Sequence, residues 1–388
     1  MAKKLISLLL VLCIMLSSSG CWNNRDLSEL SILTALAIDK KEDGRIEVTA
    51  QIIKPTAVSI SGAGNAGGGG GDKKSFVTVS ETDKTIFAAL RGMLSKVNKK
   101  IFYSSSQVIV FGEELVKSGI QEYIDFILRD HETQYKSMII VSKGATAKEV
   151  IEQQYELSKI PGAFIRETMK NSESRGFSKK LILLELAREL ATDGRELSVA
   201  TVIKEENTTN TEGLAVFKKG KMIGWLDKYE TRGYSYITSR LRSAIIEIRN
   251  PDNPQNIIGI ENMSARAKIT PKLKNDKVEI SIDIKISGNI GEQQSQLNEK
   301  HDEFCRCVEK ELDRAVTNEC INTIEKCQQE FKSDIFGFGM RVFDNYPDFW
   351  MKNSKKWNDE IFPSIKIKVK VKSKIMRTGL LANSIKIK

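Results

Sequence analysis

One stripe of apolar residues constrains the fold of this chain more than any other feature. It recurs at intervals of four, four, four, four, four, three and four residues through Phe304, Val308, Leu312, Val316, Cys320, Ile324, Cys327 and Phe331. A period near 3.6 predicts one long amphipathic helix of about eleven turns, from Gly291 to around Lys332. Glycines at 337 and 339 are expected to end it. Such a stripe requires an apolar surface to pack against, and a sheet would provide one.

Stretches with a period of two lie on both sides of this helix. Apolar side chains occupy every second position from Val278 to Ile286, which predicts one strand of a hairpin over 264–290 with one buried face. After the helix, apolar residues from Ile365 to Val371 alternate with Lys366, Lys368, Lys370 and Lys372. This strand is expected to bury its apolar face. Its lysines either protect an edge strand from pairing, which we favour, or face an anionic lipid.

The first half of the chain alternates between strand and helix patterns. Strands are predicted near 75–80, 106–111 and 137–144, with helices over 81–96, 112–130 and 145–153, the first capped by Thr82 or Asp83. The pattern predicts an α/β (mixed α+β) fold of three unlike domains, each a sheet with packed helices, after a signal peptide. The expected divisions are 1–20 for the leader, 21–205 for an N-terminal α/β domain with a glycine-rich loop at 61–74, 206–263 for a middle domain and 264–388 for a C-terminal domain.

The first twenty residues have the pattern of an export signal. Lysines precede an apolar run from Leu5 to Leu16, which is too short to cross about 30 Å of hydrocarbon as a helix. The residues before Cys21 resemble a bacterial lipobox, with Ser18 where leucine is commonest. We expect cleavage between Gly20 and Cys21 and a diacylglycerol or acyl (palmitate-type) lipid on the Cys21 thiol, because two acyl chains hold a protein on a bilayer. The alternative is an ordinary export signal with a chance cysteine.

Composition narrows the function classes. The formal net charge is +10, and the basic residues are scattered along the sequence, which suits solubility and proximity to a membrane. With two histidines and no recognisable catalytic or nucleic-acid motif, we expect no enzyme, no metal or other cofactor and no nucleic-acid partner. Cys305, Cys307, Cys320 and Cys327 all fall on the predicted helix, where they cannot surround a zinc ion. Core packing is favoured over a metal site or a disulfide.

Several segments together resemble one known family. GCWNNRDLSELSILTALAIDK from Gly20, GWLDKYETRGYSYI from Gly224, SDIFGFGMRV from Ser333 and the closing lysine strand are similar to the C-subunit lipoproteins of bacterial spore germinant receptors, the GerAC-type or Ger(x)C family. The resemblance covers essentially all of residues 21–388, and the glycine run at 62–71 looks like an insertion.

The resemblance implies a three-domain fold and a non-catalytic subunit on the outer face of the spore inner membrane. It implies action with integral-membrane A and B subunits in the response to nutrients, and it leaves open whether this subunit contacts a germinant. The residues expected to hold the fold or contact a partner are Trp22, Arg25, Trp225, Glu230, Arg232 and Gly233. The rival functions are a solute-binding lipoprotein of a transporter and, from another class, a cortex-degrading hydrolase.

Overall fold

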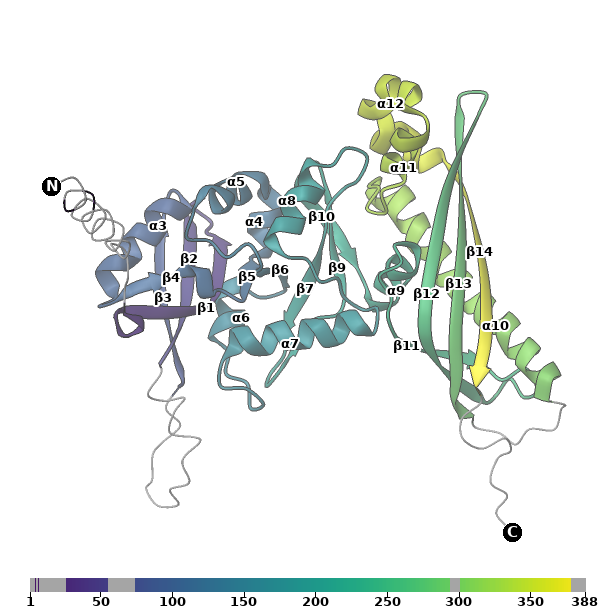
Figure 1. The fold of residues 1–388 in the computed structure, drawn as a ribbon, viewed down its shortest axis with the longest axis horizontal. Helices are drawn as coiled ribbons and strands as arrows, with labels where there is room; N and C mark the ends of the chain where they lie inside the picture. The colour runs from purple at the N-terminus through teal and green to yellow at the C-terminus, as the bar shows by residue number, and fades with distance from the viewer. Residues whose placement is uncertain (1–3, 5, 7–25, 55–73, 294–300, 378–388) are drawn as a thin grey trace, which may run out of the picture.

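The computed structural model describes residues 4, 6, 26–54, 74–293 and 301–377. Within them the chain has the predicted mixed α+β architecture, and its strands form two sheets at opposite ends of an elongated body (Figure 1). The predicted lipid-attachment and cleavage residues Cys21 and Gly20, together with Trp22, Arg25 and residues 55–73 of the glycine-rich loop, lie outside the described residues.

The larger sheet has ten strands in the order β10-β9-β7-β6-β5-β1-β2-β3, with β4 paired to β1 and β8 to β7. Its strands are β1 (Leu30–Lys40), β2 (Ile46–Ile53), β3 (Phe76–Asp83), β4 (Lys100–Phe102), β5 (Val108–Phe111), β6 (Met138–Lys143), β7 (Ser198–Lys204), β8 (Thr209–Asn210), β9 (Leu214–Lys218) and β10 (Lys221–Leu226). The central strands β1, β5, β6 and β7 are parallel, and antiparallel hairpins extend the sheet on both sides. The parallel centre explains the nearly continuous apolar runs in these strands, since both of its faces are buried.

Helices cover both faces of the larger sheet. Its helices are α3 (Ile86–Met93), α4 (Glu113–Ser118), α5 (Gln121–Arg129), α6 (Ala147–Glu152), α7 (Pro161–Ser174) and α8 (Leu183–Ala191), with short turns η1 (Leu27–Glu29), η2 (Leu94–Lys96) and η3 (Tyr103–Ser105). Apolar residues of α3, α4, α5 and α8 share one core with the sheet, and those of α6 and α7 share another on the opposite face. The result is a three-layer unit.

Local sequence signals place most of these elements correctly. Gly44 has a φ of +83° in the turn between β1 and β2, and the Asp43-Gly44 pair is a typical signal for such a hairpin. The expected helix cap was wrong: Thr82 and Asp83 end strand β3, and the side chain of Thr85 instead accepts from the Ala88 N–H at 3.1 Å. Thr85 is the better cap because its side chain lies three residues before that free N–H.

The smaller sheet has four strands in the order β11-β12-β13-β14, namely β11 (Ala244–Arg249), β12 (Ile257–Lys274), β13 (Lys277–Gln293) and β14 (Lys366–Arg377). β12 and β13 form the predicted hairpin, and β14 pairs parallel to β13 at the edge. Its helical elements are α9 (Lys228–Ile237), α10 (His301–Glu325), η4 (Lys326–Phe331), α11 (Phe338–Asn345), α12 (Pro347–Asn353), η5 (Ser354–Lys356), η6 (Trp357–Ile361) and η7 (Phe362–Ser364).

The long helix carries the predicted stripe, but its limits differ from the expectation. All eight stripe residues are buried against the sheet, whereas Gly291 belongs to strand β13. The helical stretch ends at Phe331, because Lys332 turns into the left-handed conformation with a φ of +47°. Gly337 and Gly339 do not end it; Gly337 caps α11 and Gly339 lies inside α11. Among the described helices, none has both the length and the hydropathy needed to cross a membrane.

The two sheets share the segment expected as a middle domain. Residues 206–263 contribute β8, β9 and β10 to the larger sheet, then α9, β11 and the start of β12 to the smaller unit. Leu214, Val216 and Leu226 of β9 and β10 belong to the core of the smaller unit. The units therefore meet through packed side chains at this segment.

Candidate functional site: the junction of the two units

The family-like segment 224–237 forms the end of β10 and all of α9. Helix α9 begins where the sequence provides a complete capping box: Asp227 accepts from the N–H of Glu230, and the Glu230 carboxylate accepts from the N–H of Asp227, both at 2.8 Å. Residues Thr231 to Ile237 of α9 are all buried, because the helix lies between the larger sheet and α10. This buried helix is the connection between the units.

Two charged residues of α9 pair with α10 and with η4, which continues it. Arg232 forms a bidentate pair with Glu319 and donates a further bond to the carbonyl of Ile245 at 2.9 Å. Glu230 accepts from Lys326 Nζ at 2.9 and 3.0 Å. Burial lowers the pKa of Arg232, but the bonds and charge of Glu319 outweigh it and raise the pKa, so the guanidinium stays charged. These pairs fix the register of α9 along α10.

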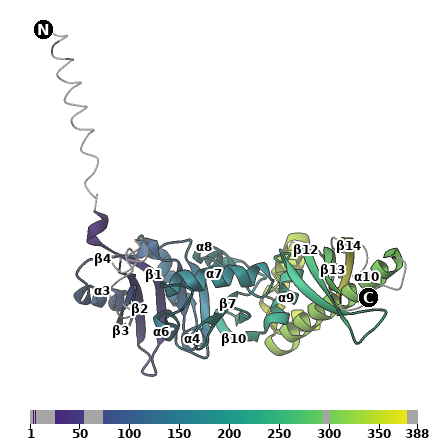
Figure 2. The ribbon, with the colours of Figure 1, turned by 90° about the horizontal axis from the view of Figure 1, so that it is seen from below.

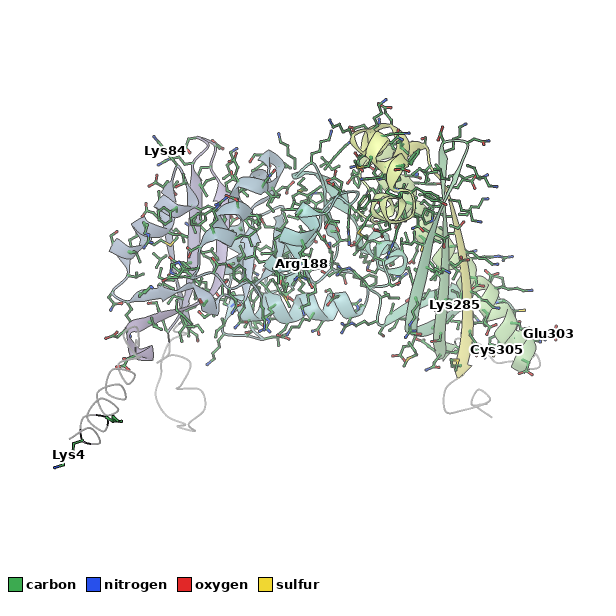
Figure 3. The ribbon with its side chains drawn as sticks, turned by 45° about the horizontal axis from the view of Figure 1, so that its top comes forward. Lys4, Lys84, Arg188, Lys285, Glu303 and Cys305 are labelled. Carbon is green, nitrogen blue, oxygen red and sulfur yellow. The ribbon has the colours of Figure 1, made fainter. Side chains whose placement is uncertain are left out.

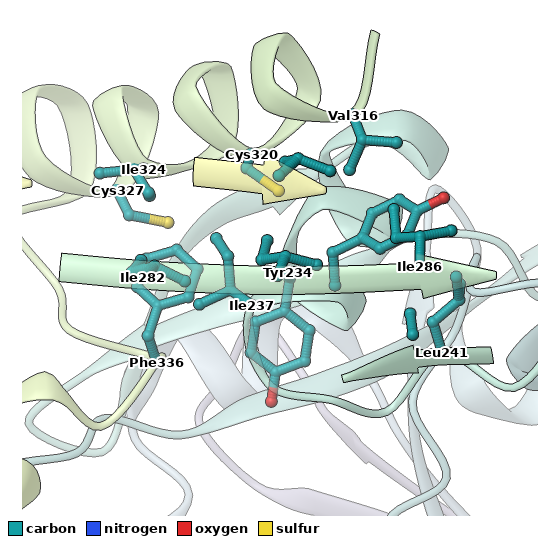
Figure 4. Close-up of a cluster of buried hydrophobic side chains, with 14 of the residues drawn as sticks. Tyr234, Ile237, Leu241, Ile282, Ile286, Val316, Cys320, Ile324, Cys327 and Phe336 are labelled. Atoms are coloured by element: carbon teal, nitrogen blue, oxygen red, sulfur yellow. The ribbon is translucent and has the colours of Figure 1, made fainter. Parts of the chain in front are cut away.

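Gly233 lies at the closest approach of α9 to α10. A Cβ atom there would lie 2.2 Å from Thr323 Oγ1 and 2.6 Å from the carbonyl oxygen of Glu319. The Thr323 hydroxyl donates to the carbonyl of Glu230 at 2.9 Å, so it cannot move aside without losing a bond. Figure 4 shows the apolar core beside this contact, in which Ile237 of α9 lies with Val316, Cys320 and Ile324 of α10. Only glycine fits at this position.

We expect Gly233→Ala to lower the free energy of unfolding by about 1–3 kcal/mol, the usual cost of inserting an atom into a packed interior. Chemical denaturation followed by circular dichroism measures the change. Gly259→Ala in β12 is the matched control, since its nearest neighbour to an added Cβ lies at 3.5 Å. Equal stability of the two variants would contradict the close-packing argument.

Of the predicted site residues, Glu230, Arg232 and Gly233 come together on α9, and Trp225 lies apart on β10. Its ring packs against the core of the larger sheet, with Lys143 Nζ 5.2 Å from the ring centroid. The four described members of this set thus lie at two places in the fold, and Trp22 and Arg25 lie outside the described residues.

A buried polar cluster that the sequence did not reveal lies beside α9. The fully buried Lys179 ammonium donates to Glu189 at 2.6 Å and to the carbonyl of Ser198 at 2.8 Å. Arg195 and Arg240 also lie 3.5 and 3.6 Å from the Glu189 carboxylate. Burial raises the pKa of Glu189, but the Lys179 and Arg195 charges outweigh it and hold the pKa below its usual value. One carboxylate thus compensates three cations.

Tyr234 of α9 completes this cluster from the other unit. Its hydroxyl accepts from Arg195 Nη2 at 3.0 Å, and its ring is completely buried. Burial raises the pKa of Tyr234, but Lys179, Arg195 and Arg240 together lower it to about 7. The cluster therefore joins the units through charge-assisted bonds, and Figure 4 shows the Tyr234 hydroxyl directed away from the α10 side of the core.

The family-like segment 333–339 makes the second connection. Asp334 is fully buried, and its carboxylate accepts from five N–H groups at 2.7–3.2 Å, namely those of Phe336, Gly337, Phe338, Gly339 and the Trp357 ring. Burial raises the pKa of Asp334, and the N–H donors oppose that rise. The Asp334 carbonyl accepts from the Glu196 N–H at 2.8 Å, which links this turn to the larger sheet unit.

A wide groove of about 1390 Å³ opens beside these contacts. Helices α5 and α8 and the 219–221 turn line one side, and Trp350, Lys355 and Trp357 line the other. Its walls carry charges of both signs, including Glu122, Asp193 and Lys221. Among the described residues no group of three or more His, Cys, Asp or Glu side chains is placed to hold a metal. Cys320 and Cys327 are free thiols buried in the helix stripe, and Cys305 and Cys307 are free and partly exposed.

Comparison with known proteins identifies these segments. Residues 23–205 match the family described as spore germination protein N-terminal domain, and residues 212–379 match spore germination B3/GerAC like, C-terminal. The chain is 27% identical to spore germination protein KC of Bacillus subtilis (strain 168), over 100% of this chain and 98% of that protein. It is 24% identical to spore germination protein B3 of the same organism, over 96% of each chain.

A solved structure shares the fold. The crystal structure of the GerBC protein superposes with a TM-score of 0.60 at 17% identity, covering 88% of this chain and 96% of that one. With both family matches spanning the two units and their junction, the chain belongs to the GerAC-type family of spore germination proteins.

Proposed function

We propose that this chain is the C-subunit of a spore nutrient germinant receptor, a non-catalytic scaffold that relays a signal between membrane partners. The observation that carries the proposal is the family match over both units, since its relatives are named spore germination proteins. The junction supports a scaffold role. The Arg195–Tyr234 bond, the Arg240–Glu189 pair and the Asp334 turn join the two units, so a force applied to one unit is transmitted to the other.

The proposed subunit acts on the outer face of the spore inner membrane with integral-membrane A and B subunits. Cleavage between Gly20 and Cys21 leaves Cys21 as the first residue, and its lipid anchors the body to the bilayer. Asp26 is the fifth residue after Cys21, so the two are at most about 18 Å apart. The anchor therefore keeps the N-terminal unit close to the membrane.

We expect Cys21→Ala to move the protein from the membrane fraction to the soluble fraction and to abolish nutrient-triggered germination. Replacing the thiol removes the site of acylation and leaves the described body unchanged. Fractionation of spores, immunoblotting and the loss of optical density after nutrient addition measure both effects. Cys13→Ala, within the leader, is the matched control and should retain both properties. Membrane retention of the Cys21 variant with normal germination would refute the tether.

A further inference from the structure

The outer face of the smaller sheet gathers cations that are scattered in the sequence. Apolar residues of β12, β13 and β14 point toward α10, so the alternate residues form the opposite face. That face has eleven basic side chains, all exposed: Arg266, Lys268, Lys272, Lys274, Lys277, Lys285, Lys366, Lys368, Lys370, Lys372 and Lys374. Among these basic residues stand two carboxylates, Glu279 and Asp283, and the exposed Glu261 and Glu292 lie farther along the same two strands, toward β11. We call this surface the basic face.

One cross-strand row of this face places like charges side by side, whereas Glu279 and Asp283 each lie between two lysines of the neighbouring strands. Lys285 pairs across strands with Arg266 on one side and Lys372 on the other. Neighbouring strands lie about 4.8 Å apart, and like charges directly opposite each other destabilise a sheet. Only one salt bridge lies on this face in the described chain, between Lys368 and Glu279 at 3.8 Å. An external anion would relieve this repulsion.

Protection of the sheet edge explains only part of the pattern. β14 is an edge strand, and its lysines suit that role. β13 is paired with β12 and β14 on its two sides, so Lys285 has no edge to protect. β12 is paired with β11 only from Ile257 to Asn262, so Arg266, Lys268 and Lys272 lie on a stretch whose other side has no strand partner in the described chain. Figure 3 shows Lys285 on the strand surface among side chains that project from the sheet. Edge protection therefore accounts for the cations of β14 and β12 but not for Lys285 of β13.

We propose that the basic face docks on the anionic phospholipid headgroups of a membrane. Ten of its eleven cations are lysines, which act as point charges toward a diffuse anionic surface, whereas recognition of single phosphates favours arginine. Its outward positions on β12–β14 include no aromatic residue of the kind that single-stranded nucleic-acid platforms use. Each Lys or Arg near an anionic bilayer strengthens binding by about fivefold.

The basic face and the lipid tether at Cys21 lie on the same side of the molecule, a comparison that rests on the proposed function. In Figure 1 the strands β12–β14 lie in front of α10, so the basic face is turned toward the viewer. Figure 2 shows the same molecule from below, and η1, in purple, lies on its upper side, the side that faces the viewer in Figure 1. The tethered end and the basic face thus point the same way at opposite ends of the long axis. Two attachments hold that axis along the bilayer.

Vesicle binding of the full chain carrying Cys21→Ala tests the basic face without acylation. Two variants neutralise it: Lys366, Lys368, Lys370 and Lys372→Gln on β14, and Arg266, Lys268 and Lys272→Gln on β12. The matched control is Lys84, Lys136 and Lys180→Gln, three exposed lysines of the larger-sheet unit. Pure phosphatidylcholine vesicles measure the background that the leader contributes, and phosphatidylglycerol is then added. Size-exclusion chromatography reports self-association through β14.

We expect binding to phosphatidylglycerol vesicles that weakens with salt, falls roughly hundredfold or more in both face variants and is unchanged in the control. Equal vesicle binding of all variants would overturn the proposal. If the β14 variant alone then self-associates, its lysines protect the sheet edge. Binding to DNA in place of vesicles would also overturn it and indicate a nucleic-acid surface. A failure here leaves the Cys21 result unaffected, so the two proposals are tested separately.

Discussion

Replacement of Asp334 by alanine is expected to lower the free energy of unfolding by about 3–5 kcal/mol. The carboxylate is fully buried and accepts from four backbone N–H groups and the Trp357 ring N–H. Its removal leaves five buried donors without their acceptor, and each unsatisfied donor costs about 1–3 kcal/mol before the turn relaxes or admits water. Relaxation is restricted because the turn is also tied to the larger sheet through Glu196.

The conservative variant separates charge from shape. In Asp334→Asn one oxygen still accepts, but an NH₂ group replaces the other oxygen. Depending on which oxygen is replaced, the NH₂ faces either the N–H groups of Gly339 and Trp357 or the three backbone N–H groups that bond the other oxygen. We expect an intermediate loss of stability, and no loss in the exposed control Asp348→Asn. Urea unfolding followed by tryptophan fluorescence measures all three, because Trp357 contacts Asp334 directly. Wild-type stability of the alanine variant would show that the turn is held by packing alone.

Periodicity predicted the elements of the smaller unit well. The stripe from Phe304 to Phe331 and the alternation from Val278 to Ile286 each define one buried face, and the structure buries both in one core. Periodicity predicts which face of a helix or strand is buried, but not which element packs against that face. It could not show that β9 and β10 join the larger sheet, because their turn signal around Gly220 fits a hairpin in either unit.

The junction was harder to predict because its partners are distant in sequence. Nothing near Lys179 marks it as buried, and its partners Glu189 and Ser198 lie 10 and 19 residues away. Arg232 and Glu319 are 87 residues apart. The one local signal was the Asp-Ile-Phe-Gly-Phe-Gly run at 334–339. Its aspartate is followed by closely spaced glycines, which let the backbone fold back so that its N–H groups reach the carboxylate. Of the basic face, the sequence suggested only the β14 lysines, because the cations of β12 and β13 are spread over different segments.

Glu189→Gln is the second change with a large expected effect. It removes the one carboxylate that faces Lys179, Arg195 and Arg240, so three cations at the junction lose their compensation. Breaking a buried ion pair from one side costs about 3–5 kcal/mol. Glutamine keeps the shape of the side chain, and the loss therefore reports the charge. Chemical denaturation of the purified protein at neutral pH measures it.

Two comparisons make this prediction specific to the cluster. Lys179→Met should cost less than Glu189→Gln, because Glu189 keeps Arg195 and Arg240 when the lysine is absent. The second comparison is the pH dependence. The neighbouring cations hold the pKa of Glu189 below its unfolded value of about 4.3, so its contribution is complete above that value and is lost as the pH falls through the lower folded pKa. The stability gap between wild type and Glu189→Gln must therefore close on acidification. A gap that persists at low pH would mean that the glutamine disturbs packing and that charge compensation does not hold the two units together.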